Sequence, residues 1–292
     1  MHFVEAKGIL SGGNGMNLYR GCTHGCIYCD SRSLCYQMSH AFEDIEVKKN
    51  ALELLEKTLK GKKKRCMIGT GAMTDPYIPL EEKLGLTRGA LELIEKYGFG
   101  IAIQTKSARI LRDLDLLTKI NQRTKAVVQM TLTTQDDALC RILEPNVSVT
   151  SERVAALKTF REAGISTVVW LAPILPYIND SRESIQGILE SCIDAGVKGV
   201  LCFNMGLTLR DGNREYFYAQ LDRHFPGLKQ RYIREFGNRY EINSPRNREL
   251  MQMFHETCEK AGMMHSIDQI FHFLHEFEEK DENPQISFWQ EV

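Results

Sequence analysis

Residues 21–29 read GCTHGCIYC and place three cysteines, Cys22, Cys26 and Cys29, at spacings of four and three. Three thiolates in one short loop can hold three corners of a cubane cluster of four irons and four sulfides, because cysteine is the usual ligand of such iron. The fourth iron then has no protein ligand. The spacing therefore predicts a metal centre with an open coordination position, as in reactive rather than structural metal sites.

Two other interpretations of this loop stay open. The three cysteines could hold a structural zinc ion together with His24 or Cys35, which would make the chain a non-catalytic metal-binding module. They could also belong to a ferredoxin-like electron carrier, but a ferredoxin needs a fourth cysteine at a matching spacing. Cys35 lies six residues beyond Cys29 and is a poor candidate for that place.

The composition is that of an ordinary globular protein, with 43% hydrophobic and 26% charged residues in a chain of 292. An odd total of nine cysteines argues against a secreted disulfide framework and for reduced thiols. The longest apolar stretch, 168–178, contains two prolines and is too short to cross a membrane. The first residues show no export signal, so we expect a cytoplasmic protein.

Apolar runs of strand length alternate with amphipathic stretches of helix length, which is the pattern of parallel βα units. The expected strands are 16–19, 66–69, 100–105, 126–132, 166–172 and 199–203. The expected helices are 47–59, 81–96, 107–120, 151–163 and 182–195. We predict an α/β fold, a partial (β/α)6 TIM-like barrel over residues 1–205, followed by a mainly helical C-terminal extension over 206–292. The acidic tail 277–292 is expected to be loosely held.

The cysteine motif resembles that of the radical S-adenosylmethionine (SAM) superfamily, in which an aromatic residue precedes the third cysteine, as Tyr28 does here. Four further fragments are similar to the spore photoproduct lyase-like branch, often labelled DNA repair photolyase-like. They are TDPY at 74–77, TKS at 105–107, EP at 144–145 and APILPYIND at 172–180.

This resemblance implies a [4Fe–4S] cluster on Cys22, Cys26 and Cys29, with SAM chelating the open iron. An electron from a donor such as ferredoxin or flavodoxin would cleave SAM to methionine and a 5′-deoxyadenosyl radical. That radical would abstract hydrogen from an unidentified substrate, for which the branch suggests damaged nucleic acid. The residues that the resemblance assigns to SAM are Thr74, Lys106, Thr131 and Ala172.

Two departures from the branch bear on the substrate. The lyase of this branch uses a cysteine as hydrogen donor, three residues before the aspartate of its TDPY-type fragment. This chain has Ala72 at that position. The lyase also has a tyrosine directly after the third cluster cysteine, where this chain has Asp30. Cys35 and Cys202 are weak candidates for a replacement thiol, since free cysteines are commonly small core residues.

Two basic regions could contact phosphates. A run of lysines and arginine between 57 and 65 joins an expected helix to a strand, which places it at the N-terminal face, away from barrel chemistry. Within 223–248, arginines alternate with Tyr232 and Tyr240 in a pattern that can bind nucleic acid. Acidic residues dilute this second region, and the net charge of −1 provides no general attraction to nucleic acid.

Overall fold

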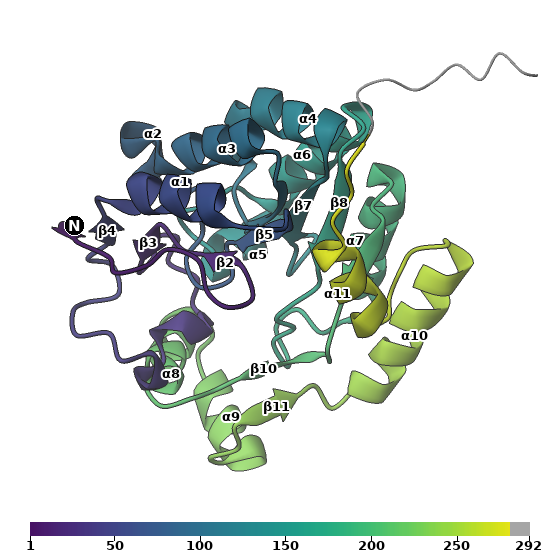
Figure 1. Cartoon of the computed structure of the whole chain (residues 1–292). Helices are drawn as coiled ribbons and strands as arrows, with labels where there is room; N and C mark the ends of the chain where they lie inside the picture. The colour runs from purple at the N-terminus through teal and green to yellow at the C-terminus, as the bar shows by residue number, and fades with distance from the viewer. Residues whose placement is uncertain (281–292) are drawn as a thin grey trace, which may run out of the picture.

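A parallel six-stranded sheet forms the centre of the computed structural model, which describes residues 1–280. Its strand order is β2-β5-β6-β7-β8-β9, so that β2 and β9 are the two end strands of an incomplete barrel (Figure 1). The predicted partial barrel is therefore confirmed. The strands are β2 (Gly15–Met16), β5 (Met67–Thr70), β6 (Gly100–Thr105), β7 (Ala126–Thr131), β8 (Ser166–Trp170) and β9 (Gly199–Leu201).

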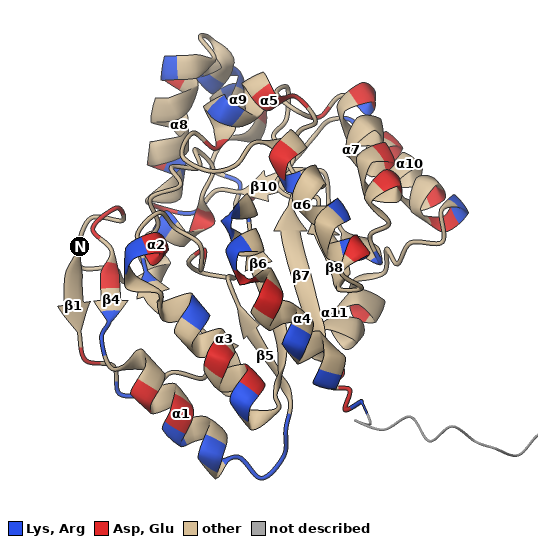
Figure 2. Ribbon diagram, turned by 90° about the horizontal axis from the view of Figure 1, so that it is seen from above, with Lys and Arg blue, Asp and Glu red and all other residues tan. Residues whose placement is uncertain are grey.

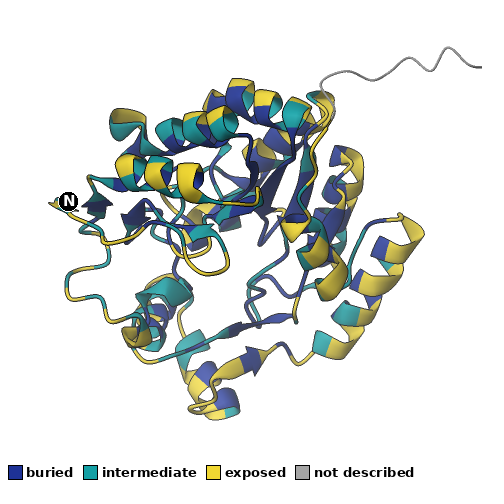
Figure 3. Ribbon diagram, in the orientation of Figure 1, coloured by how far each residue is buried: buried dark blue, intermediate teal, exposed yellow. Residues whose placement is uncertain are grey.

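Amphipathic helices cover the outer face of the sheet and expose their other side to solvent (Figure 3). They are α1 (Ala51–Gly61), α3 (Leu86–Tyr97), α4 (Leu114–Arg123), α6 (Thr150–Glu162) and α7 (Arg182–Ala195). Gly98, Gly164 and Gly196 each follow a helix with φ between 63° and 72°, the left-handed conformation expected of glycine after a helix end.

Three local differences from the prediction have simple causes. The helix expected over 81–96 is divided into α2 (Glu81–Leu84) and α3, because Gly85 adopts a φ of 64°. The helix expected over 107–120 begins as a 3₁₀ turn, Ala108–Asp113, before α4. A short helix that was not expected, α5 (Asp137–Leu143), begins at the carboxylate of Asp136, which accepts two backbone N–H bonds.

The N-terminal arm forms a small second sheet of β1 (His2–Val4), β4 (Glu46–Lys48) and β3 (Tyr19–Arg20). The strand expected over 16–19 is thus shared between two sheets, since β2 pairs with β5 while β3 pairs with β4. The helix expected to begin at residue 47 begins only at Ala51, because 46–48 are used as strand β4.

The C-terminal part contains β10 (Gly206–Thr208), α8 (Asn213–His224), α9 (Leu228–Phe236), β11 (Glu241–Asn243), α10 (Asn247–Lys260) and α11 (Ile267–His275). Helix α10 joins the main core through its buried residues, and β10 pairs antiparallel with β11. No helix within residues 1–280 is long and apolar enough to span a bilayer.

Side chains alternate between the two faces of each barrel strand. Val128 and Met130 of β7 face the outer helices, whereas Val127 belongs to an inner cluster with residues of β5, β6, β8 and β9. Helix α11 closes this inner cluster with Ile270 and Leu274. Because Glu278 then pairs with Lys125 at the start of β7, at 2.6 Å, this helix lies toward the N-terminal strand ends.

The acidic tail and the basic run 57–65 meet at this same end of the barrel. Glu278 and Glu279 pair with Lys125 and Arg65, so the first residues of the tail are held rather than loose. Residues 281–292, for which the same loose attachment was expected, lie outside the described residues. The basic loop follows α1 at the end of the molecule opposite β10 (Figure 2), as the topology predicted.

Candidate functional site

The cysteine loop leaves β3 through a tight backbone approach at Gly21. Gly21 has a φ of +88°, and a Cβ there would lie 2.4 Å from the carbonyl oxygen of Phe42. Only glycine fits this approach without a shift of the backbone. The N–H of Cys22 then donates to the same carbonyl at 3.1 Å, so the loop begins from a fixed position. Cys22 and Cys26 are buried, and Cys29 is half-buried.

The spacing of the three sulfurs tests whether the loop fits zinc or a larger cluster. The three thiols are close enough to influence one another's ionisation. In residues 1–280, however, they do not form a group of ligand atoms lying within 4.8 Å of one another. Two sulfurs on one zinc ion are at most about 4.6 Å apart, since each Zn–S bond is about 2.3 Å. A four-iron cluster binds each cysteine to a different iron and needs no such close grouping, so the loop lacks the ligand spacing of a single zinc ion.

Burial also keeps the thiols of Cys22 and Cys26 protonated when no metal is bound. It raises the pKa of Cys22 to about 12 and raises the pKa of Cys26 above its ordinary value. A coordinating metal removes the thiol proton outright. Assembly of a metal centre therefore releases protons from this loop.

A buried ion pair holds the loop to the barrel. The hydroxyl of Tyr28 donates to Glu144, whose other carboxylate oxygen lies 2.5 Å from the guanidinium of Arg153. Arg153 also donates to the carbonyl oxygens of Ser148 and Thr131, at 2.8 and 2.9 Å. Although burial disfavours the carboxylate, Arg153 and Lys106 hold the pKa of Glu144 below its usual range. The aromatic residue of the motif thus has a specific partner, and the pair is fully buried.

Backbone contacts join the same two segments. The N–H of Ile27 donates to the carbonyl of Leu143 at 2.9 Å, and the N–H of Asn146 donates to the carbonyl of His24 at 3.0 Å. The side-chain amide of Asn146 donates to Thr23 at 3.0 Å. The EP fragment at 144–145 therefore supports the cysteine loop rather than reaching the cavity.

Asp75 of the TDPY fragment links three parts of the site. Its carboxylate accepts the Thr105 hydroxyl at 2.7 Å and the backbone N–H groups of Tyr77 and Lys106, at 2.9 and 2.8 Å. It also lies 3.5 Å from Nδ1 of His24, which is buried within the cysteine loop. TDPY and TKS therefore form one hydrogen-bonded unit, in which the threonine fixes the turn and the lysine side chain is free to project.

Lys106 projects toward the cysteines from the end of β6. Burial disfavours the ammonium of Lys106, but the electrostatic influence of Cys26, Glu144 and Asp75 holds its pKa above its ordinary value, so it stays charged. Lys106 is thus a buried cation beside the cysteine loop. A ligand with a carboxylate could form a charge-assisted hydrogen bond with it.

A cavity of about 510 Å³ opens beside this lysine, a volume typical of small-molecule sites. Residues from the cysteine loop, from the C-terminal ends of β5, β6, β8 and β9, and from β10 and β11 line it: Cys26, Tyr28, Cys29, Asp30, Ser31, Tyr36, Ala72, Met73, Lys106, Trp170, Ala172, Pro173, Phe203, Asn204, Gly206, Leu207, Thr208 and Glu241. This is the face on which barrel enzymes place their chemistry.

A second cavity of about 210 Å³ lies between β2 and α11 and shares Ala72 and Trp170 with the first. Gln104 and Gln129 line it from the inner face of the sheet, and the indole N–H of Trp170 donates to Gln129 at 2.9 Å. This second cavity therefore reaches the inner face of the sheet.

The structure brings together only some of the residues assigned to SAM by resemblance. Lys106 and Ala172 line the larger cavity. Thr131 is buried at the end of β7 on the same face as Gln129, but it does not line the cavity, and its carbonyl is held by Arg153. Thr74 is buried beside Asp75 and also stays outside the lining.

The two thiols considered as hydrogen donors lie elsewhere. Cys202 is buried with its sulfur 3.8 Å from Met251 of α10, on the outer face, while its neighbour Phe203 faces the cavity. Cys35 is exposed outside the lining and accepts a hydrogen bond from Arg210 at 3.2 Å. Neither sulfur faces the cavity.

Aromatic side chains that the sequence did not single out form one wall of the cavity. The rings of Trp170 and Phe203 lie 6.1 Å apart, and Phe203 is half exposed. Tyr36 lines another wall and donates to Asp30 at 3.1 Å. The alternation of strand faces could have identified Trp170 and Phe203, since Val168 and Leu201, two residues earlier, belong to the inner cluster.

Several basic side chains in the region 223–248 pair with acidic neighbours. Lys229 pairs with Asp222 at 2.6 Å and Arg231 with Glu235 at 2.8 Å. Tyr232 is fully buried and donates to the carbonyl of Pro176 at 2.8 Å, so it cannot stack on a base. Tyr240 remains about half exposed.

The open barrel, the cysteine loop with two buried thiols and one half-buried thiol, and the adjoining cavity favour an enzyme site over an electron carrier. The chain belongs to the radical SAM superfamily, whose family model matches residues 16–192. Enzymes of this family use a [4Fe–4S] cluster and SAM, and they need a reductant.

Relatives and solved structures agree with this assignment. An uncharacterized protein of Mycobacterium tuberculosis is 32% identical over 81% of this chain and 71% of its own length. One of Acidianus two-tailed virus is 27% identical over 75% of this chain and 76% of its own. Spore photoproduct lyase in complex with a dinucleoside spore photoproduct shares the fold, with a TM-score of 0.61 and 16% identity over 85% of this chain and 74% of that one.

The buried pair yields a first prediction. Replacing Glu144→Ala leaves the Arg153 charge buried without its partner, which should lower the free energy of unfolding by about 3 to 5 kcal/mol. Urea denaturation of the metal-free protein measures this loss. The matched control is Glu162→Ala at the exposed end of α6, which should change stability by less than about 0.5 kcal/mol. Equal stability of the two variants would contradict the role given to Glu144.

Proposed function

We propose that this protein binds a [4Fe–4S] cluster through Cys22, Cys26 and Cys29 and cleaves SAM reductively in the adjoining cavity. The observation that supports this most directly is the convergence of Cys26, Cys29 and the charged Lys106 on one cavity at the C-terminal strand ends. When bound, the two cofactors supply a one-electron cleavage that yields methionine and a 5′-deoxyadenosyl radical able to take hydrogen from a substrate.

Each part of the chain has a distinct task in this proposal. Lys106 pairs with the carboxylate of SAM, Asp75 fixes the backbone from which Lys106 projects, and Glu144 with Arg153 fixes the loop that carries the thiolates. Ala172 forms the wall against the adenosine. Thr74 and Thr131 stay assigned by resemblance alone, since neither lines the cavity.

The substrate we propose has a flat apolar group. Trp170 and Phe203 both line the cavity, and aromatic rings in such a wall pack well on planar groups. Damaged nucleic acid, the class suggested by the resemblance, has such groups in its bases. The paired charges around Tyr232 argue against the C-terminal basic region as its main binding surface.

We propose a cytoplasmic location and a ferredoxin or flavodoxin as the electron donor. The location is supported by the nine cysteines of the sequence, since reduced thiols and an exposed iron are stable only in a reducing compartment. Detection of the protein in a membrane or secreted fraction would contradict it. Failure of both donors to support SAM cleavage, while a chemical reductant does, would contradict the choice of donor.

The direct test is SAM cleavage after anaerobic reconstitution with iron and sulfide. The parent protein should bind about four irons per chain and form 5′-deoxyadenosine when a reductant is added. Replacing Cys22, Cys26 and Cys29 together by alanine should abolish both, while Cys66→Ala, a half-buried thiol before β5, should retain them. A colourless parent that carries tightly bound zinc would support the non-catalytic alternative instead.

Lys106→Ala should weaken SAM binding by about 10- to 150-fold, the equivalent of a charge-assisted hydrogen bond of about 1.5 to 3 kcal/mol. Iron content should not change, because Lys106 is no ligand. Equilibrium dialysis of the reconstituted protein with labelled SAM measures the effect. Lys83→Ala on the exposed side of α2 serves as the control, and equal affinity in both variants would show that Lys106 does not contact SAM.

The chain should not repair the spore photoproduct efficiently. Ala72 lines the cavity at the position where the resembled lyase has its hydrogen-donating cysteine, so a product radical formed here lacks that thiol. Ala72→Cys should raise the yield of repaired dinucleotide, whereas Ala72→Ser, of similar size but without a thiol, should not. Repair by the parent at the rate of a lyase assayed in parallel would refute this proposal.

A further inference from the structure

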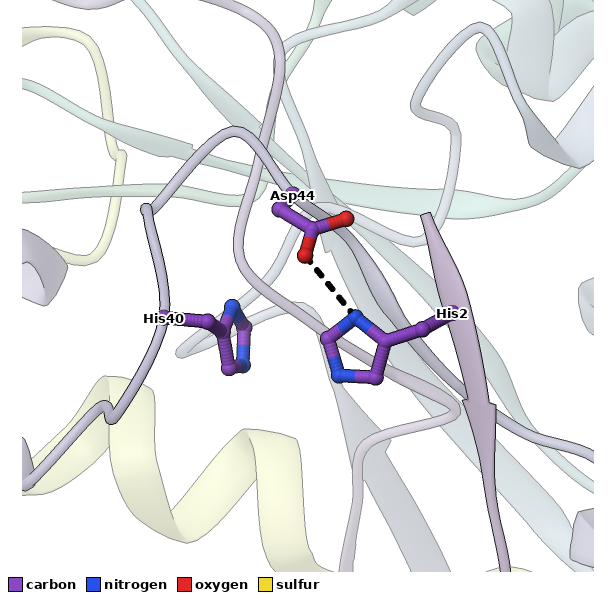
Figure 4. Close-up of side chains that lie close together, drawn as sticks. All are labelled: His2, His40 and Asp44. Atoms are coloured by element: carbon purple, nitrogen blue, oxygen red, sulfur yellow. Dashed lines mark hydrogen bonds and ion pairs between the residues drawn. The ribbon is translucent and has the colours of Figure 1, made fainter.

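Two histidines and an aspartate gather on the N-terminal arm, away from the cysteine loop. His2 lies on β1, His40 lies in the connection between the cysteine loop and β4, and Asp44 lies just before β4 (Figure 4). One ligand atom from each lies within 4.8 Å of those of the other two. In the described part of the chain, no other group of three such residues meets this distance.

The hydrogen bonds of His40 leave one ring nitrogen free to act as a ligand. Its Nδ1 lies 3.0 Å from the carbonyl oxygen of Ala41, which can only accept, so Nδ1 carries the proton in the neutral ring. Its Nε2 then bears the lone pair, and this atom is buried without a hydrogen-bond partner. Histidines that bind metals commonly show this arrangement, with one nitrogen donating to a carbonyl and the other on the ion.

The groups around His40 and His2 suit a cation. Nδ1 of His2 lies 3.0 Å from one oxygen of Asp44, while the other oxygen lies 2.8 Å from the amino group of Met1. The carboxylate of Glu46 lies 3.6 Å from Nε2 of His40. The two imidazole rings stand at 86° to each other with their centres 4.6 Å apart, an edge-to-face arrangement that brings them close beside Asp44 (Figure 4).

We propose that His2, His40 and Asp44 form a binding site for a divalent transition-metal ion of the zinc class. Two imidazole nitrogens and one carboxylate oxygen are a common zinc ligand set, with a fourth position left for water or for Glu46. Ligand atoms of a tetrahedral zinc ion lie about 3.4 Å apart, so on binding the ligand atoms would move within their present limit of 4.8 Å. All three side chains are partly solvent-exposed, which gives the ion a path of entry.

The ion would add a link between the N-terminal arm and the segment before β4, which the pairing of β1 with β4 already joins. Strand β1 pairs only with β4, over three residue pairs. The connection that carries His40 begins directly after Cys29, and a bound ion fixes its far end to β1. The site therefore acts as a structural clamp on the arm beside the cysteine loop, and it requires neither the cluster nor SAM.

Zinc titration of the full-length reconstituted protein, with a chromogenic chelator as competitor, tests this proposal. The parent should bind one equivalent of zinc more than His40→Ala, and also one more than His2→Ala, whose side chain comes from a different element. The control is the double variant His255→Ala and His265→Ala, which removes another pair of neighbouring histidines, 3.0 Å apart through their Nδ1 atoms. This control should bind as much zinc as the parent.

A thermal measurement provides the second readout. Zinc should raise the unfolding midpoint of the parent and of the His255/His265 control, because an ion that binds only the folded chain stabilises it. Zinc should not change the unfolding midpoint of the His40→Ala variant. Equal zinc stoichiometry in the parent and His40→Ala, or an equal rise in their midpoints, would overturn the site. Because the assay measures zinc and not turnover, its failure leaves the proposed SAM chemistry untouched.

Discussion

The buried ion pair of Glu144 and Arg153 is the interaction on which the arrangement of the site depends. Removing two charges from water costs several kcal/mol each, and such a pair persists only where additional hydrogen bonds satisfy it. Here Tyr28 donates to the carboxylate, while Arg153 donates to two backbone carbonyls. Because Tyr28 lies between Cys26 and Cys29, the pair fixes the loop that presents the thiolates. The carboxylate of Glu144 also helps to keep the ammonium of Lys106 charged. One buried group therefore acts on both the cysteine loop and the lysine.

Much of the fold could be predicted because its signals are local. Strand-length apolar runs, amphipathic helices and glycines after helix ends each act within a few residues, and the six parallel strands and helix α7 follow that pattern. The cysteine motif is equally local, since its spacing alone defines a loop able to hold three corners of a cluster. The fragments TDPY and TKS lie together, but Asp75 and Thr105 hold the turn while Lys106 is the residue of these fragments that lines the cavity.

Other features depend on contacts between residues far apart in the chain. Tyr28 and Glu144 are separated by 116 positions, and no local pattern links them to Arg153. The division of the first strand between two sheets depends on β4, which competes with the start of the expected helix. Cys202 shows a different limit, because a thiol just after β9 is visible in the sequence, whereas the side of the sheet on which it lies is not. The alternation from Leu201 to Phe203 places the phenylalanine in the cavity and the cysteine against α10.

The central claim is that three cysteines hold a cluster whose fourth iron is open to SAM, and electron paramagnetic resonance of the reduced, reconstituted protein tests it most directly. The account predicts the signal of a reduced [4Fe–4S] cluster and a change in its g values when SAM is added. It also predicts that Lys106→Ala needs more SAM for the same change. A cluster signal that SAM leaves unaltered at saturating concentration, or no iron–sulfur signal at all, would contradict the account.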